Sequence, residues 1–187
     1  MTQQGPDILS NRRARKWSSK QLLGRALWET LQCPLFRWTP RQFWGWRRWI
    51  LRMFGARVGS RVHIHPSVKI AIPWNLRIDE NAAIGDGAIL YSLGLISIGA
   101  NATISQYAHL CAGSHDFRKP DMPLTKPPIE IGAGAWICAD AFIGPGVCIG
   151  EICVVGARAV VVRSVARGAI VAGNPATQVG TRVKAVE

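Results

Sequence analysis

One histidine in this sequence stands where an irregular loop begins, and its setting suits it for proton transfer. His115 lies in the run Gly113-Ser114-His115-Asp116, just before a stretch with four prolines. Histidine changes its charge near neutral pH, and a loop held by a rigid scaffold is a common place for a general base. Asp116 or a backbone carbonyl would orient the ring and fix its tautomer. A His-Asp pair in a surface turn is the commoner arrangement, so the surrounding elements must decide.

Those elements are repeats of six residues. A branched aliphatic residue occurs at every sixth position through one uninterrupted run: Ile131, Ile137, Ile143, Ile149, Val155 and Val161. Neither the 3.6-residue period of a helix nor the two-residue period of a strand fits this spacing. Small residues precede the aliphatic by two positions, and glycine, which tolerates the positive φ of tight corners, often follows it. The pattern is typical of a solenoid of three-sided coils.

The same period recurs upstream in three shorter runs, which begin at Val58, Ile78 and Ile98. The largest break in the pattern is rich in turn-forming residues and is expected to leave the solenoid as a loop. About six coils fit before Pro175, which predicts an all-β fold of stacked parallel strands. We expect four segments: a basic, poorly ordered tail (1–20), a helical arm rich in Trp and Arg (21–56), the β-helix (57–176) with its loop (112–128), and a C-terminal tail (177–187).

Nearly all of the net charge of +12 lies ahead of the repeats. Residues 1–61 hold 13 Lys or Arg against 2 Asp or Glu, together with six of the eight Trp. We expect one helix over 40–54, with Thr39 as its N-cap and Pro40 at its first position, and a weaker helix over 21–31. One face of the helix over 40–54 would carry Phe43, Trp46, Ile50, Met53 and Phe54.

Two roles fit this arm, and they do not exclude each other. It could cap the open first coil, as solenoids need. It could also touch an anionic membrane surface through its Trp residues and through Arg41, Arg47, Arg48 and Arg52. No recognition motif accompanies the basic residues, so no nucleic-acid partner is expected.

No apolar run reaches the ~18–20 residues that cross a bilayer, and no signal-peptide core is visible. We therefore expect a cytoplasmic protein, located at the inner face of the membrane if the arm binds lipid. Cys138 and Cys153 fall where the repeat needs small apolar residues, which predicts buried, reduced thiols. His63 and His65 are expected at surface turns. His109 occupies a repeat position and is either structural or close to the site.

Taken together, these features resemble the hexapeptide acyltransferases, over about residues 35–176. The resemblance rests on the repeat, the break Ala112-Gly113-Ser114-His115-Asp116, the restart Trp136-Ile137 and the closing Ala172-Gly173-Asn174-Pro175-Ala176. Within this family the chain is similar to the colanic acid biosynthesis acetyltransferases, relatives of the galactoside, maltose and nodulation-factor O-acetyltransferases. The segments that suggest this branch are Phe36-Arg37-Trp38-Thr39-Pro40, Trp46-Arg47-Arg48, Phe54-Gly55-Ala56 and Tyr91-Ser92-Leu93-Gly94.

The resemblance implies a left-handed parallel β-helix, contrary to the usual right-handed crossover. It also implies a homotrimer, acetyl-CoA as acyl donor, no metal, and a free or lipid-linked sugar as acceptor in exopolysaccharide or cell-surface glycan biosynthesis. His115 would take the proton of a sugar hydroxyl, and the oxygen would attack the thioester directly in a ternary complex.

Further site residues follow from the resemblance alone. Trp136, Gly156 and Ala157 match positions that meet the donor, and Arg163 stands where relatives often have Lys. The galactoside-type relatives carry an acceptor-binding Asn near the position of Asp86-Gly87, which this chain lacks. Tyr91 and Ser92 are expected to take its place.

Three alternatives stay open at this point. The acceptor could be an amino sugar, which would make the protein an N-acetyltransferase. A zinc lyase of the γ-carbonic-anhydrase type shares the fold, but it needs three converging His, and only His109 and His115 are suitably placed. A non-catalytic trimeric β-helix is the third, against which the intact His115 loop argues.

Overall fold

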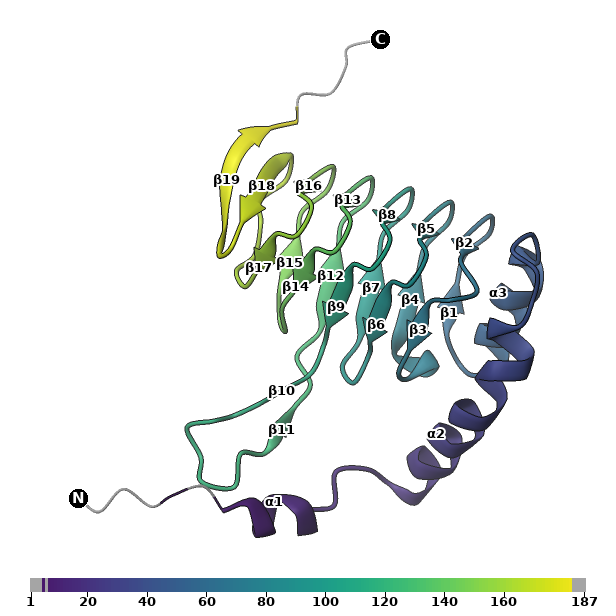
Figure 1. Cartoon of the computed structure of the whole chain (residues 1–187), viewed down its shortest axis with the longest axis vertical. Coiled ribbons are helices and arrows are strands. Elements are labelled where there is room, and N and C mark those ends of the chain that lie inside the picture. Colours follow the sequence, from purple (N-terminus) through teal and green to yellow (C-terminus); the bar gives the residue numbers. More distant parts are fainter. Residues whose placement is uncertain (1–4, 6, 183–187) are drawn as a thin grey trace.

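Short strands joined by tight corners build three flat sheets, which the chain visits in turn (Figure 1). The computed structural model describes residues 5 and 7–182. The strands stack in parallel as a β-helix of about six coils, as the repeat predicted, and the helix is left-handed, as the resemblance implied. Sheet 1 contains β1 (Arg57–Val58), β4 (Leu76–Ile78), β7 (Ile96–Ile98), β12 (Ile129–Ile131) and β15 (Cys148–Ile149).

The two other sheets complete each coil. Sheet 2 contains β2 (His63–Ile64), β5 (Ala83–Ile84), β8 (Thr103–Ile104), β13 (Trp136–Ile137), β16 (Val154–Val155), β18 (Ala169–Gly173) and β19 (Ala176–Thr181). Sheet 3 contains β3 (Lys69–Ile70), β6 (Ile89–Tyr91), β9 (His109–Cys111), β14 (Phe142–Ile143) and β17 (Val160–Val161). A 3-10 turn, η2 (Pro73–Asn75), fills the first slip in the repeat.

The aliphatic residues of the repeat form the core inside the prism. Ile137, Ile143 and Ile149 are fully buried, and the preceding small residues, such as Ala135 and Ala141, are buried with them. Each buried aliphatic side chain contributes about 1.5–3 kcal/mol to folding. The predicted inward register is therefore confirmed.

Close contact between coils, rather than positive φ, explains the glycines that follow the aliphatics. A Cβ on Gly132 would lie 2.5 Å from the backbone nitrogen of Glu151 in the next coil, and Gly150 is equally confined. The positive φ angles occur later in each corner, at residues such as Asn81 and Asn101. Asparagine tolerates this left-handed conformation better than most residues.

The arm differs in detail from its prediction. It contains α2 (Ser19–Gln32), which begins two residues before the predicted arm, the π-helix η1 (Cys33–Arg37) and α3 (Trp44–Met53), and a short helix, α1 (Ile8–Arg13), precedes it. Ser18 caps α2 in a capping box with Gln21. The prediction for α3 was wrong at its start, because Phe43 rather than Thr39 precedes it. Within the described residues, no helix has the length and apolarity that a bilayer crossing requires.

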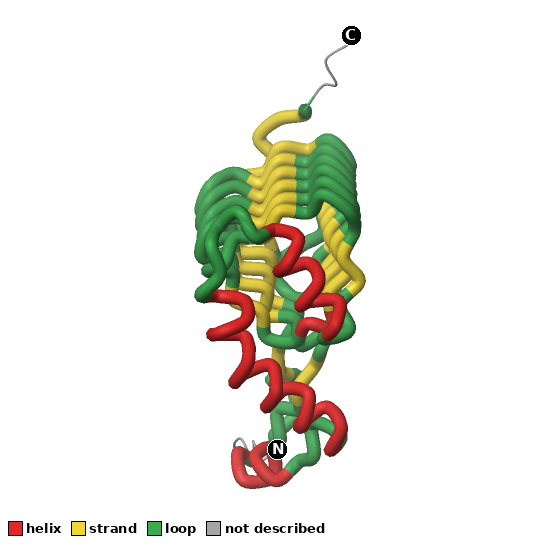
Figure 2. The backbone as a smooth tube through the Cα atoms, turned by 90° about the vertical axis from the view of Figure 1, so that its right-hand side faces the viewer, coloured by secondary structure: helices red, strands yellow, loops and turns green. Residues whose placement is uncertain are grey.

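The residues predicted to share one face of helix α3 differ in their burial. Arg47, Ile50 and Leu51 are buried, whereas Trp46 and Met53 are exposed. The two helices α2 and α3 cross the open end of the stacked coils (Figure 2). Their inward faces thus cap the first coil.

The arm donates hydrogen bonds to each strand of the first coil. Parallel coils donate their N–H groups to the carbonyls of the following coil, as His63 does to Ala82 at 2.9 Å. The carbonyls of the first coil therefore have no preceding coil as partner. Side chains of the arm donate to these carbonyls instead. The hydrogen bonds are Arg52 Nε to Val58 O (2.9 Å), Arg48 to Val62 O (2.9 Å), Arg47 Nε to Ile64 O (2.7 Å) and Trp28 Nε1 to Ile70 O (2.8 Å).

Both segments expected as tails contain regular structure. Helix α1 lies within 1–20, and its Asp7 cap accepts hydrogen bonds from Ser10. Strand β19 occupies most of 177–182 and pairs antiparallel with β18. Residues 1–4, 6 and 183–187 lie outside the described part of the chain.

Candidate active site

The loop at 112–128 folds as a two-stranded hairpin that projects from the prism (Figure 1). Strand β10 (Ser114–His115) pairs antiparallel with β11 (Leu124–Thr125). The chain leaves after β9 in sheet 3 and returns at β12 in sheet 1. Because Ile98 still pairs with Ile131, the excursion leaves the register of the coils intact.

His115 is exposed on this hairpin, and its ring is held through one nitrogen. Nδ1 lies 2.6 Å from the carbonyl oxygen of Met122. A carbonyl can only accept a hydrogen bond, so Nδ1 carries the proton in the neutral ring. The lone pair on Nε2 then faces outward, free to accept a proton. This is the tautomer that a general base requires.

The structure assigns the orienting role to Met122 and not to Asp116. The Asp116 carboxylate accepts from the backbone N–H of Arg118 at 3.2 Å and lies 3.4 Å from its Nε. The Asp116 N–H donates to Pro123 at 3.0 Å, which closes the hairpin. The predicted orienting role of Asp116 was therefore wrong, and the alternative of a backbone carbonyl is correct.

Ser92 does not fit the predicted acceptor site. Its side chain is fully buried, and its Oγ both accepts from the N–H and donates to the carbonyl of Ile72, at 2.9 and 2.8 Å. These bonds tie two neighbouring coils together at the corner before sheet 1. Tyr91 is 40% exposed on sheet 3 and packs edge-on against His109. Of this predicted pair, only Tyr91 is accessible to an acceptor.

The donor-binding residues expected from the resemblance lie at three different places on the chain. Trp136 is about half exposed on sheet 2, where its Nε1 donates to Ser105 Oγ at 2.9 Å. Gly156 and Ala157 form the corner between sheets 2 and 3. Arg163 is exposed after β17, at the corner between sheets 3 and 1 from which the hairpin leaves two coils earlier.

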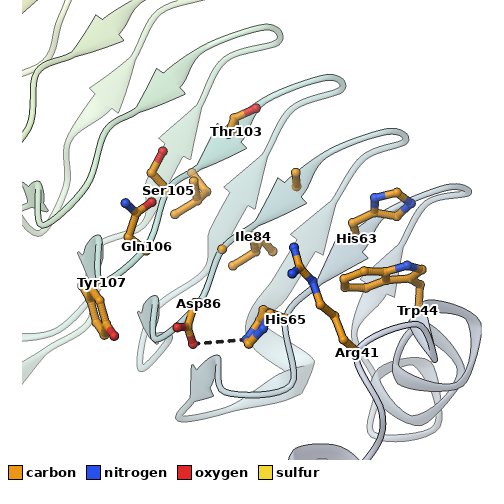
Figure 3. Close-up of a pocket in the computed structure, with 13 residues that line it drawn as sticks. Arg41, Trp44, His63, His65, Ile84, Asp86, Thr103, Ser105, Gln106 and Tyr107 are labelled. Carbon is orange, nitrogen blue, oxygen red and sulfur yellow. Dashed lines mark ion pairs between the residues drawn. The ribbon is translucent and has the colours of Figure 1, made fainter.

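A groove of about 600 Å³, not predicted from the sequence, runs along sheet 2 beside the arm (Figure 3). Trp44 stacks on His63 with ring centroids 4.8 Å apart, and Arg41 lines the same groove. His65 Nδ1 lies 3.2 Å from the Asp86 carboxylate. Stacked coils bring residues about twenty positions apart side by side, and this rule could have found the His65–Asp86 pair. The groove offers an aromatic ring, a guanidinium and two imidazoles to a polar ligand.

His109 lies between two aromatic rings on sheet 3. Tyr91 and Phe142 both meet it edge-on, and its Nε2 is buried with no hydrogen-bond partner among the described residues. Burial lowers the pKa of His109 from its ordinary value. The described residues contain no group of three or more His, Cys, Asp or Glu arranged to hold a metal ion.

Sequence comparison identifies relatives of the whole repeat region, although no family model matches the chain. Over 158 residues, the chain is 44% identical to WcaF of Escherichia coli strain K12, covering 84% of this chain and 87% of that protein. WcaF carries the provisional name of a colanic acid biosynthesis acetyltransferase. The galactoside O-acetyltransferase of the same strain is 27% identical over 133 residues, covering 69% of this chain and 65% of that protein.

Solved structures share the fold at lower identity. A hexapeptide-repeat acetyltransferase of Vibrio cholerae, complexed with acetyl-coenzyme A, gives a TM-score of 0.80 at 21% identity, covering 95% of this chain and 97% of that one. A maltose O-acetyltransferase from Clostridium difficile 630 gives 0.79 at 23% identity, covering 89% and 90%. The 44% identity to WcaF extends over most of both chains. The chain therefore belongs to the hexapeptide-repeat acyltransferases.

Proposed function

We propose that this protein transfers an acetyl group from acetyl-CoA to a hydroxyl group of a sugar in exopolysaccharide or cell-surface glycan biosynthesis. The observation that carries the proposal is the tautomer of His115, which its contact with Met122 fixes at 2.6 Å. The similarity to WcaF supports acetyl transfer as the reaction and glycan biosynthesis as its setting. The acetyl-coenzyme A complex of the Vibrio cholerae structure supports the donor.

The chemistry assigned to His115 is proton transfer. Nε2 accepts the hydroxyl proton as the oxygen attacks the thioester carbon, and the Met122 carbonyl stabilises the imidazolium that results. The carbon–sulfur bond then breaks, and CoA leaves as a thiol that takes the proton from Nε2 and restores the neutral ring. No covalent acyl-enzyme is needed, so the cysteines have no part in this scheme. Cys153 is fully buried, and burial raises the pKa of its thiol, which disfavours a nucleophilic role.

The proposed assembly is a homotrimer with active sites between subunits. The His115 hairpin projects away from the prism, and Trp136 lies on a different face of the same chain. A neighbouring chain would bring its own Trp136 and Gly156 towards this hairpin, and the groove beside Trp44 would lie open to the acceptor. Light scattering tests this assembly, and an active monomer at assay concentration would overturn it.

We further place the protein in the cytoplasm, with its arm against the inner face of the membrane, where lipid-linked saccharides are made. The support is a set of exposed apolar side chains on α2 and α3 beside basic residues. The predicted contact was wrong for Arg47, which is buried, whereas Arg48 and Arg52 bond to the first coil and are half-buried and exposed, respectively. The exposed Arg41 remains available to anionic headgroups.

The decisive experiment is an acetyl-transfer assay with panels of free, nucleotide-linked and lipid-linked sugars. We expect an ester product, released by mild alkali, and a loss of about 10²–10⁴-fold in rate for His115→Ala. Val179→Ala is the control, because Val179 is exposed on β19, outside both the hairpin and the groove. An alkali-stable amide as the sole product would identify an N-acetyltransferase. Full activity of His115→Ala on an accepted sugar would overturn the mechanism.

A further inference from the structure

Helix α1 and the residues beside it lie against the His115 hairpin, although about a hundred residues separate them in the sequence. Figure 1 shows α1 beside the end of the β10–β11 hairpin. The Asp7 N–H donates to the Pro120 carbonyl at 2.6 Å, and Lys126 Nζ donates to the Lys16 carbonyl at 3.2 Å. These contacts form a brace between the N-terminus and the hairpin.

One residue of this brace reaches the group that orients the catalytic ring. Asn11 Nδ2 lies 2.6 Å from the carbonyl oxygens of both Asp121 and Met122. The Met122 oxygen also accepts from His115 Nδ1 at 2.6 Å. A carbonyl oxygen has two lone pairs, so it can serve both donors at once.

Hydrogen-bond chemistry fixes the orientation of the Asn11 amide. Its Oδ1 accepts from Lys16 Nζ at 2.7 Å, and an ammonium group can only donate. The two carbonyls on the other side can only accept. Only one of the two amide orientations satisfies all three partners, so the donor side of Asn11 faces Met122.

The Met122 carbonyl needs such support because its backbone is unfavourable. Met122 has a φ of +40°, in the left-handed region that residues with a Cβ adopt at a cost. The tip of the hairpin is also far from the packed core, which could otherwise hold this peptide in place. An external donor to the oxygen adds a restraint on its direction to the backbone bonds of Met122 N–H with the Lys119 carbonyl and of Asp116 N–H with the Pro123 carbonyl.

We propose that Asn11 is a positioning residue, which holds the Met122 carbonyl and through it the Nδ1-protonated tautomer of His115. The inference rests on the proposed role of His115 as the base. A small misplacement of a reacting group costs up to about 10²-fold in rate. Asn11→Ala should therefore lower kcat by about 10- to 100-fold, while KM for acetyl-CoA stays within about twofold.

Two further variants sharpen this test. Asn11→Asp keeps the size of the side chain and its contact with Lys16 but removes both N–H donors, so it should lose as much kcat as Asn11→Ala. Arg12→Ala is the matched control, because Arg12 is exposed on the same helix and is expected to keep full activity. Unchanged kcat in Asn11→Ala and Asn11→Asp would overturn the inference.

A double-mutant cycle separates positioning from a general loss of structure. If Asn11 acts through His115, adding Asn11→Ala to His115→Ala should not slow the residual reaction further. An equal loss in both backgrounds would show that Asn11 acts independently and would overturn the inference.

The tautomer can also be observed directly in the folded full-length protein. ¹⁵N NMR of the histidine side chains, assigned with His115→Ala, should show a protonated Nδ1 for His115 in the wild type and a mixture of tautomers in Asn11→Ala. An unchanged His115 signal would overturn the inference. This readout does not depend on turnover, so it still tests Asn11 if His115→Ala is fully active and the proposed mechanism fails.

Discussion

Arg47 Nε donates to the Ile64 carbonyl at 2.7 Å and so fastens helix α3 to the first strand of sheet 2. The same guanidinium donates to Thr39 Oγ1 and Pro40 O at 2.7 and 2.8 Å, and to the carbonyl of Arg41. It is fully buried without a carboxylate partner, and burial lowers its pKa. The positive charge is thus used to satisfy carbonyl groups that the end of a β-helix leaves without donors.

Replacing Arg47 by leucine should destabilise the fold strongly. The change would leave the buried Ile64 carbonyl without its donor, which costs about 1–3 kcal/mol, and would remove the contacts with Thr39, Pro40 and Arg41 as well. We expect a loss of at least about 2 kcal/mol in urea unfolding, against little change for the exposed Arg41→Leu. Equal unfolding midpoints for the two variants would contradict the capping role.

Ile143→Asp should prevent folding rather than weaken catalysis. Ile143 is fully buried in the middle of the repeat, between β9 and β17. An unpaired carboxylate there loses the burial of an aliphatic side chain and adds a desolvation penalty. The measurement is solubility and thermal melting, with Val162→Asp as an exposed control on the following coil. A soluble Ile143→Asp protein with a cooperative melt would show that the register is wrong.

The stability of the protein should fall in mild acid partly because of His109. Burial lowers the pKa of His109 in the folded state, so the unfolded chain takes up a proton first as the pH falls below about 6.5. Stability from this source is complete above that pH and is lost below it. His109→Phe, which can pack between Tyr91 and Phe142, should lose less Tm between pH 7 and pH 5 than the wild type. Equal losses would exclude this contribution.

Trp136→Ala should weaken donor binding with little effect on the chemical step. The indole is exposed on sheet 2 and is held by its bond to Ser105, so it presents a fixed surface. Loss of binding common to the ground and transition states raises KM and leaves kcat unchanged. We expect KM for acetyl-CoA to rise roughly tenfold, and Trp38→Ala, another exposed Trp, to have no such effect. A fall in kcat alone would place Trp136 in a different role.

The arm should bind vesicles that contain anionic lipid. Trp46, Trp49 and Met53 are exposed on α3, with the exposed Arg41 near its start. We expect flotation at low salt that disappears at 1 M NaCl, where the Debye length falls to about 3 Å. Trp49→Ala should float less than the wild type, and Val179→Ala, which alters an exposed residue at the other end, should not. Protein that stays soluble at every lipid composition would restrict the arm to capping.

The sequence predicts most of the β-helix because its period requires only that identical side chains face inward. Ile143 is buried for the same reason as Ile131, and no distant partner is needed to establish this. The arm lacks such a rule. Arg47 was expected at the membrane surface because it is charged, but the structure buries it completely, whereas Trp46 on the same helix is exposed. The difference arises because a first coil needs hydrogen-bond donors as well as apolar cover.

The site was predicted where chemistry is local and missed where it depends on contacts between distant residues. His115 stands at a visible break in the pattern, so its position signals its role. A serine such as Ser92 is usually found at the surface, and the sequence does not show that this one is buried. Its hydrogen-bond partner is the backbone of Ile72, twenty positions earlier. Asn11 gives no signal at all in the sequence. Its importance depends on a carbonyl more than a hundred residues away.

The register across the His115 hairpin has a consequence for how such enzymes diversify. Ile98 pairs with Ile131, 33 positions later, whereas Ile78 pairs with Ile98 after only 20. The additional residues all leave and rejoin at one corner, and no inward side chain changes place. This corner therefore acts as an insertion point, where a segment of new length and sequence can be exchanged as a cassette. Substrate preference can evolve there without any change to the core.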